Sequence, residues 1–405
     1  MSLQQSQVQM KWRLKYPPRE WQRAAFEIWK RKSSGVVSVV TGGGKTVFAQ
    51  LCIMDFIVKN PTGKVFIVVP TTTLLDQWIS SLIDELNVSA DEISQFSGEK
   101  SSKKTSPINV LVINTARTKI EKLAGNHPSL LVVDECHRAG SPINAKSIKG
   151  KFSATLGLSA TPEREGDNGF YEHISPALGE IIFKYTYREA KRDKVICDFD
   201  LFNVQTKMST EEETEYNHLT KKIQKVSHMV TTGKCDESVL KNLLLKRARV
   251  SGNTAKRIPV AIKLAAMNAG ERTIIFHESI EAANMLFETL NDLGKSVTVY
   301  HSKLGYNARR SNLLNYRQGV FDILVTCRAL DEGMNAPETS VAIIASSTSS
   351  SRQRIQRLGR VLRPSPSKSS ATIYTLYCTE IERRRLETEE SNMSGVAKVK
   401  WLNAQ

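Results

Sequence analysis

Short runs of β-branched and other apolar residues recur along the chain, separated by longer stretches with helical periodicity. One set of runs covers residues 35–40, 65–69, 110–113, 130–133 and 156–158, and a second set covers residues 273–276, 296–300, 323–326, 341–345 and 371–377. The stretches between them, such as 46–58 and 279–293, have the length and spacing of helices. Apolar strands that alternate with helices indicate parallel sheets covered on both faces. The pattern therefore predicts an α/β fold with two such domains.

Between the two sets, over residues 187–270, this alternation stops. The chain becomes rich in Lys and Glu there, with helical periodicity from Thr210 onward. Residues 221–263 contain eleven Lys or Arg and only two acidic residues, Asp236 and Glu237, which leaves a surplus of nine positive charges. Such a segment is either a solvated helical connector or a basic arm that lies against a nucleic-acid backbone.

The charge of the whole chain favours a polyanionic partner. Its 405 residues carry 57 Lys and Arg against 41 Asp and Glu, a net charge of +16. A surplus of this size attracts nucleic acid or acidic lipid. The hydrophobic content of 40% and the charged content of 24% are those of a globular protein and exclude a mostly disordered chain.

Membrane and zinc-binding classes are disfavoured. No apolar run approaches the ~20 residues that a membrane-spanning helix needs, and residues 1–10 lack the apolar core of a signal peptide. The six cysteines lie far apart with no Cys-x-x-Cys pair, which fits free thiols in a reducing compartment. We expect an intracellular, cytoplasmic protein, nucleoid-associated or nuclear according to the cell type, with no membrane partner.

A glycine-rich stretch follows the first apolar run and precedes a helical stretch. It contains Thr41, Gly42, Gly43, Gly44, Lys45 and Thr46. Glycines let backbone N–H groups approach a phosphate, and the N-terminus of the next helix adds a favourable dipole. In such a loop the lysine reaches the β- and γ-phosphates and the threonine hydroxyl holds Mg²⁺. We therefore expect an ATP site here, although Val39 stands where the usual pattern has its first glycine.

An acidic pair, Asp134 and Glu135, directly follows the apolar run 130–133. A carboxylate at the carboxyl end of a parallel strand points into the crevice where α/β sheets bind ligands. Asp134 suits the Mg²⁺ shell, and Glu135 suits orienting or deprotonating the attacking water. An isolated pair of this kind is as often a helix cap, but about 90 residues after a phosphate loop it predicts the second half of a nucleoside triphosphatase site.

Residues 353–363 have the pattern of an amphipathic helix. Polar residues, Gln353, Gln356, Arg360 and Arg363, fall on one stripe, and apolar residues fall on the other side. The stripe is either an ordinary solvated face or a catalytic one. In the second interpretation Gln356, Arg360 and Arg363 act at the γ-phosphate, the arginines as arginine fingers, a role that lysine does not fill.

These three elements and six further motifs occur in an order that resembles the superfamily 2 DNA helicases and translocases, most closely the XPB-like branch. The motifs are an Arg-x-x-Gln element at 19–22, motif I at 41–46, motif Ia at 69–72 with 77–78, motif Ib at 114–117, a DExH motif II at 134–137, motif III at 158–162, motif IV at 273–276, motif V at 330–337 and motif VI at 353–363. The resemblance implies two tandem RecA-like domains, residues 1–188 and 189–405. Residues 189–270 would be a basic, helical, thumb-like segment between the two strand sets.

The resemblance also implies roles for residues outside the phosphate loop. ATP and Mg²⁺ would be the cofactors, with Arg19 and Gln22 on the adenine side and Asp331 and Gly333 in the nucleotide pocket. Hydrolysis in the cleft between the domains would drive movement along DNA in the 3′-to-5′ direction. The residues implied to couple the ATP site to nucleic acid are His137, Ser159, Thr161 and Glu332.

The implied partner is single-stranded or duplex DNA bound by a monomer. Thr71, Thr115 and Thr326 would contact the nucleic acid, and the basic segment would add Lys246, Arg247 and Arg249. The sequence leaves room for a protein partner such as a nuclease or a repair factor.

Two alternatives stay open, and the chain departs from the branch at two places. Backbone contacts carry little sugar information, so an RNA-dependent ATPase or helicase fits the motor core; a nucleotide-gated DNA clamp that recruits a nuclease fits as well. The Arg-Glu-Asp element of the branch reads Arg-Glu-Gly-Asp at 164–167, so strand separation by this element is not predicted. The eighteen residues before Arg19 are too few for a DNA-distortion-sensing domain, so a motor without one is expected.

Overall fold

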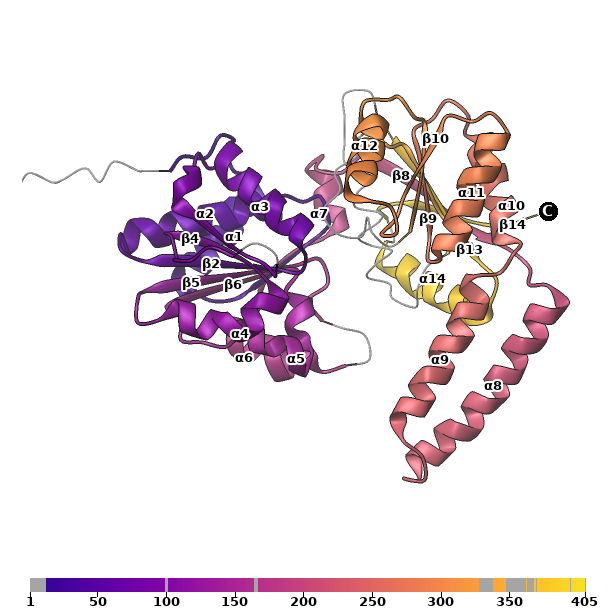
Figure 1. The fold of residues 1–405 in the computed structure, drawn as a ribbon, viewed down its shortest axis with the longest axis horizontal. Helices are drawn as coiled ribbons and strands as arrows, with labels where there is room; N and C mark the ends of the chain where they lie inside the picture. Colours follow the sequence, from indigo (N-terminus) through magenta and orange to yellow (C-terminus); the bar gives the residue numbers. More distant parts are fainter. Residues whose placement is uncertain are drawn as a thin grey trace, which may run out of the picture. The chain divides into compact units, whose positions relative to one another are not determined.

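The computed structural model describes residues 12–98, 101–163, 167–327, 338–346, 362, 368, 370–393 and 395–404. The chain divides into two compact units, Met1–Thr186 and Tyr187–Gln405 (Figure 1). The expected boundary after residue 188 falls inside the helix α7 (Tyr187–Arg192). Each unit contains one seven-stranded sheet in which all neighbouring strands are parallel, so the predicted α/β class with parallel sheets is confirmed.

The first sheet has the strand order β3-β4-β2-β5-β6-β1-β7. Its strands are β1 (Val36–Val39), β2 (Lys64–Val69), β3 (Ile93–Phe96), β4 (Ile108–Val112), β5 (Ser129–Asp134), β6 (Ala154–Ser159) and β7 (Ile181–Tyr185). The strands that precede the glycine-rich loop and the acidic pair, β1 and β5, are separated only by β6. Because parallel strands end at the same edge, the sheet brings these two motifs together.

Helices cover both faces of this sheet. Figure 1 shows α1 (Glu20–Lys32), α2 (Lys45–Lys59) and α3 (Thr72–Asp84) on one side and α4 (Ile113–Ala124), α5 (Pro142–Ala145) and α6 (Ser175–Leu178) on the other. On the second side, Ile120 of α4 joins Phe66, Leu131 and Val133 of the strands in one buried cluster. Burial on both faces explains why the strands read as continuous apolar runs.

The second sheet has the order β10-β11-β9-β12-β13-β8-β14. Its strands are β8 (Asp198–Gln205), β9 (Thr273–His277), β10 (Val297–Tyr300), β11 (Ile323–Cys327), β12 (Val341–Ile344), β13 (Ser370–Tyr377) and β14 (Lys398–Asn403). The helices α10 (Arg257–Met267) and α11 (Ile280–Asp292) pack on the sheet through a buried cluster that includes Leu264 and Leu286. The unit also contains α12 (Tyr306–Arg317) and α14 (Glu380–Asn392).

The basic segment is helical, as its periodicity predicted, and its first two helices form a hairpin. Its helices are α8 (Thr210–Thr231) and α9 (Glu237–Gly252), and Figure 1 shows them side by side, extending away from the sheet of their unit. Leu219 and Ile223 of α8 pack against Leu243 of α9 in a small core of their own. The side chains of Ser209 and Asp236 cap the N-termini of the two helices.

Four strands of the structure are not among the predicted apolar runs. The unpredicted strands are β3, β7, β8 and β14, and Ile113 begins α4 rather than ending a strand. At the C-terminal side of the unit, β14 pairs along β8, and the Trp401 indole Nε1 donates to Glu390 at 3.0 Å. β14 is an edge strand with four exposed residues and no buried one, so it lacks the apolar run that marks the buried strands.

Candidate functional site

The glycine-rich loop lies between β1 and α2 at the carboxyl edge of the first sheet. Gly42 and Gly44 have φ angles of 85° and 97°, which disfavour residues with a side chain. A Cβ at Gly43 would lie 2.5 Å from a methyl of Val39, and one at Gly44 would lie 2.9 Å from the Gln22 amide. The three glycines therefore make a close backbone turn that opens directly into the N-terminus of a 15-residue helix. Val39, the departure from the usual loop pattern, is the last residue of β1.

Lys45 and Glu135 form the central ion pair of this edge. The Lys45 Nζ lies 3.0 Å from Glu135 Oε1, and both side chains are 13% exposed. Burial disfavours the ammonium, but the charges of Glu135 and Asp134 outweigh it and raise the pKa of Lys45. Burial likewise disfavours the Glu135 carboxylate, but Lys45 and His137 outweigh it and hold the pKa of Glu135 far below its usual range. Both groups are therefore charged at neutral pH.

Asp134 differs electrostatically from its neighbour Glu135. Burial raises the pKa of Asp134, against the opposing effect of Lys45. Its Oδ2 accepts a hydrogen bond of 2.9 Å from the indole Nε1 of Trp78, which is 2% exposed. Glu135 has a left-handed backbone, with φ 47° and ψ 48°, uncommon for a residue with a side chain. Because of this turn, the Asp134 carboxylate faces Trp78, whereas the Glu135 carboxylate faces Lys45.

Trp78 is a site residue that sequence reasoning did not identify as such, because it was noted only as part of a motif. It lies in α3, whose N-cap is Thr71. The same helix contacts α2 through the buried Gln50, whose Nε2 donates to Ser81 Oγ at 2.9 Å. The helix α3 is therefore joined both to the helix that follows the phosphate loop and to the acidic pair. The signal in the sequence was a single aromatic residue on the buried face of an amphipathic helix.

Motifs II and III meet through the buried His137. Its Nδ1 lies 3.0 Å from Ser159 Oγ and 3.4 Å from Glu135 Oε2. Ser159 is the last residue of β6, and its Oγ accepts a bond of 3.1 Å from the Thr161 backbone N–H. Three of the residues expected to couple the sites are thus joined to one another and to Glu135.

The Arg-x-x-Gln element holds the phosphate loop from the other side. Gln22 is 2% exposed; its Nε2 donates to Gly44 O at 2.9 Å and its Oε1 accepts from the Arg19 backbone N–H at 2.7 Å. Arg19 Nη1 and Trp21 Nε1 both reach Gly43 O, at 3.3 and 3.2 Å. Trp21 also stacks on Tyr185, with ring centroids 4.9 Å apart. These contacts position the loop; the adenine-reading role of Gln22 stays a prediction.

The residues present fit a nucleotide phosphate with Mg²⁺. The hydroxyl of Thr41 is buried without a hydrogen-bond partner, and Lys45 follows four residues later as the first residue of α2. No group of three or more His, Cys, Asp or Glu that could hold a metal ion occurs in the part of the chain that the structure describes. Mg²⁺ at a nucleotide site binds through one or two protein oxygens together with substrate phosphates. Thr46 and Asp134 are the side chains suited to it.

The residues expected to contact nucleic acid differ in exposure. Thr71 and Thr115 are half-buried and follow the ends of the adjacent strands β2 and β4. Thr326 is fully buried in β11, so its hydroxyl does not reach the surface. On the hairpin, Lys246 and Arg249 are exposed, whereas Arg247 lies 5.5 Å from the centroid of the Tyr216 ring.

Several expected site residues lie outside the described residues. They are Asp331, Glu332 and Gly333 of motif V, Gln356, Arg360 and Arg363 of motif VI, and residues 164–166.

A glycine turn after one parallel strand, with a lysine paired to a carboxylate after a nearby strand, is the nucleotide site of a P-loop nucleoside triphosphatase. Two comparisons with protein families agree with this class. Residues 15–164 match the family described as "Type III restriction enzyme, res subunit", and residues 256–365 match the "Helicase conserved C-terminal domain". Together the two matches cover the phosphate loop, the acidic pair and motifs IV to VI.

Relatives of known description extend over most of the chain. A "DNA 3'-5' translocase XPB2" of Sulfurisphaera tokodaii is 27% identical over 85% of this chain and 78% of that protein. A "DNA 3'-5' helicase XPB" of Kineococcus radiotolerans is 25% identical over 88% of this chain and 59% of that protein, so the chain spans little more than half of its length. Through these two domain matches and these relatives, the chain resembles the superfamily 2 helicases and translocases, in particular their XPB-like branch.

Solved structures agree on the fold. Yeast Dbp5 bound to RNA and ADP BeF3 has a TM-score of 0.65 at 14% identity, covering 95% of this chain and 90% of that one. The Pyrococcus furiosus Hef helicase domain has a TM-score of 0.55 at 18% identity, covering 92% of this chain and 98% of that one. Among the described residues, no helix is long and apolar enough to cross a membrane.

Proposed function

We propose that this chain is an ATP-dependent DNA translocase or helicase that moves in the 3′-to-5′ direction. The observation that carries the proposal is the Lys45–Glu135 pair beside Asp134, at the edge where the glycine loop opens into α2. The relatives described as DNA 3'-5' translocase and DNA 3'-5' helicase support the substrate and the direction.

The ion pair has a direct consequence for the order of events at the site. Lys45 bonds to Glu135 through the ammonium that a P-loop lysine uses for the β- and γ-phosphates. When ATP is bound, Lys45 turns to the phosphates and releases Glu135. The freed carboxylate then orients and deprotonates the attacking water. Bound Mg²⁺ supplies charge stabilisation on the phosphates, and Thr46 and Asp134 are the residues that hold it.

In our proposal, one group of residues couples the ATP site to nucleic acid, and a second group acts on the nucleotide itself. His137, Ser159 and Thr161 respond to the state of Glu135, because His137 lies against both Glu135 and Ser159. Glu332 of motif V belongs to the same coupling group by family resemblance. Gln356, Arg360 and Arg363 act on the γ-phosphate, and Arg19, Gln22, Asp331 and Gly333 complete the nucleotide pocket.

The nucleic acid lies along the carboxyl edges of the sheets. Thr71 follows β2 and is the N-cap of α3, and Thr115 follows β4 and lies in the first turn of α4. The N-termini of both helices attract phosphate. The hairpin adds the exposed positive charges of Lys246 and Arg249. Arg247 contributes to the same surface while it also packs against Tyr216.

One set of assays tests the function and its alternatives. ATP turnover is measured with single-stranded DNA, duplex DNA, RNA and no nucleic acid, with Lys45→Ala as the inactive control. Stimulation by DNA and not by RNA supports the proposal, and equal stimulation by RNA supports the RNA-dependent alternative. Displacement of an annealed strand identifies a helicase, whereas displacement of only a triplex-forming strand identifies a duplex translocase. Tight DNA binding without stimulated turnover identifies a clamp.

A further inference from the structure

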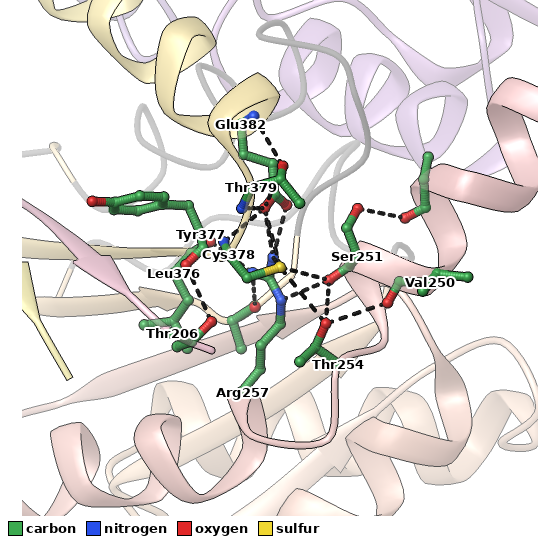
Figure 2. Close-up of polar contacts among 12 residues, drawn as sticks. Thr206, Val250, Ser251, Thr254, Arg257, Leu376, Tyr377, Cys378, Thr379 and Glu382 are labelled. Carbon is green, nitrogen blue, oxygen red and sulfur yellow. Dashed lines mark hydrogen bonds and ion pairs between the residues drawn. The ribbon is translucent and has the colours of Figure 1, made fainter. Parts of the chain in front are cut away.

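Arg257 is a fully buried arginine that the ATP site does not use. It is the first residue of α10 and is 0% exposed. Figure 2 shows its guanidinium surrounded by acceptors from several elements. Nε donates to Ser251 O at 2.9 Å, and Nη1 donates to Ala345 O at 2.9 Å and to Leu376 O at 2.7 Å. Nη2 contacts both carboxylate oxygens of Glu382, at 2.7 and 2.9 Å.

These acceptors come from four different parts of the second unit. Ser251 lies in the last turn of α9, Ala345 directly follows β12, Leu376 lies in β13 and Glu382 lies in the first turn of α14. A single side chain therefore joins the hairpin to the carboxyl ends of two neighbouring central strands. We call Arg257 and Glu382 the root clamp.

Other contacts strengthen the same junction. Glu212 in the first turn of α8 accepts a hydrogen bond of 2.9 Å from the Ala255 backbone N–H, so the start of the hairpin is held beside its end. The Thr254 hydroxyl donates to Ser251 O at 2.9 Å and lies 3.6 Å from Cys378 Sγ, as Figure 2 also shows. A Cβ at Gly252 would lie 3.1 Å from Ser346 Oγ. The root of the hairpin is thus closely packed against the strand ends.

The chemistry of the clamp requires arginine. Burial disfavours the guanidinium charge, but Glu382 and Cys378 outweigh it and raise the pKa of Arg257. Only a planar guanidinium presents donors to three carbonyls and a carboxylate at once. A lysine keeps the charge but loses this geometry, so Arg257→Lys loosens the junction without leaving Glu382 unpaired.

We propose that the root clamp makes the α8–α9 hairpin and the carboxyl ends of β12 and β13 one rigid body, so that DNA bound on the hairpin alters ATP turnover through these strand ends. The inference rests on the proposed function. The carbonyl of Ala345 accepts from Arg257, and Ala345 precedes motif VI at 353–363 by eight residues in the chain. Arg257 is a positioning residue, not a catalytic one.

The first test separates coupling from stability. In Arg257→Lys we expect the DNA-free ATPase rate and the DNA affinity to be kept, and the maximal DNA-stimulated rate to fall about fivefold or more. The matched control is Leu286→Ala, which removes buried core of the same unit away from the clamp; it lowers the melting temperature but keeps the stimulation ratio. If Arg257→Lys also keeps the ratio, or loses basal and stimulated rates in the same proportion, the inference is wrong.

The second test does not depend on DNA stimulation. Cys235 lies in the turn between α8 and α9, and Lys295 is an exposed residue after α11. Spin labels on Cys235 and on Lys295→Cys allow the distance between the hairpin turn and the rest of the unit to be measured. Cys52, Cys136, Cys197 and Cys327 are buried, and burial raises the pKa of Cys378 to about 11, so these thiols react slowly. We expect a narrow distance distribution that broadens in Arg257→Lys, and also in Glu382→Gln should the lysine variant fail to fold. Equal distributions in the wild-type protein and the folded variant overturn the rigid root clamp. A wild-type protein without DNA stimulation overturns the proposed function and the coupling that rests on it, and leaves the rigidity of the clamp to this distance measurement.

Discussion

The indole Nε1 of Trp78 donates a 2.9 Å hydrogen bond to Oδ2 of Asp134, the carboxylate proposed to hold Mg²⁺. The donor belongs to α3, and the N-terminal end of that helix is capped by Thr71, a proposed nucleic-acid contact. One rigid helix therefore joins the edge proposed to bind DNA to the acidic pair of the ATP site. A shift of α3 along its axis would change the bond to Asp134.

Trp78→Phe tests this relationship. Phenylalanine keeps most of the buried ring but removes the donor, and a hydrogen bond to a charged group contributes about 1.5 to 3 kcal/mol. We expect the Mg²⁺ concentration for half-maximal ATP turnover to rise about tenfold or more. Trp29→Phe is the control, because the Trp29 Nε1 donates to Thr155 O in the same unit and not to the acidic pair. An unchanged Mg²⁺ dependence would show that the hydrogen bond from Trp78 to Asp134 does not affect Mg²⁺ binding.

Glu135→Gln and Lys45→Ala have opposite effects on nucleotide binding. Before ATP binds, the Glu135 carboxylate pairs with Lys45 and so competes with the phosphates of ATP for its ammonium. Glu135→Gln removes this charge, so ATP binding is kept or becomes tighter. Hydrolysis falls by a factor of about 100 or more because the water loses its base. Lys45→Ala loses both binding and turnover. Equilibrium binding of a fluorescent nucleotide and single-turnover hydrolysis measure the two effects, and normal hydrolysis by Glu135→Gln would contradict the assigned role.

Much of the fold was predictable because the central strands are buried on both faces. The runs at 65–69 and 341–345 differ from the observed strands by one residue, since few other structures bury five consecutive apolar residues. The edge strands were not predictable in this way. The sequence of β14 begins by alternating Lys with apolar residues, and none of its residues is buried. Its pairing depends on β8, nearly two hundred residues earlier in the chain.

The site was predictable to the extent that its residues are adjacent in sequence. Lys45, Asp134 and Glu135 were identified from local motifs, and the parallel sheet brings them together. Trp78 and Arg257 were not, because their roles depend on partners 56 and 125 residues away. Arg257 was counted among the charges of a basic arm, but it is buried and paired with Glu382. A count of charges does not distinguish a solvated arginine from a buried one.

The salt dependence of DNA binding tests the hairpin surface. Lys246 and Arg249 are exposed, so their replacement by Gln removes up to two phosphate contacts. We expect weaker binding and a slope of log K against log salt that is shallower by up to about two. Arg384→Gln with Arg385→Gln on α14 is a control of equal charge change. A slope that changes as much in the control as on the hairpin would assign the effect to overall charge.

Alkaline stability tests the environment of Cys378. Burial raises the pKa of this thiol from 9.0 to about 11, with a further contribution from Glu382. The folded protein thus retains a proton that the unfolded chain releases, so the stabilising contribution is complete below pH 9.0 and is lost as the pH rises to about 11. The loss is at most about 3 kcal/mol.

Melting temperatures between pH 8 and 11 measure this loss. Cys378→Ser does not titrate in this range, so its stability should decline less steeply than that of the wild-type protein, while Cys235→Ser, in the turn of the hairpin, should follow the wild type. Parallel curves for all three proteins would show that the Cys378 thiol is already accessible to solvent.

The hairpin is anchored at one end, which gives it the mechanics of a lever arm. The 22 residues of α8 span about 33 Å from the root clamp to the turn. One nucleotide of a DNA strand advances by about 3.4 Å, so a rotation of about 6° at the root displaces the far end by one nucleotide. A small angular change at the strand ends is thereby converted into motion on the scale of a single base step.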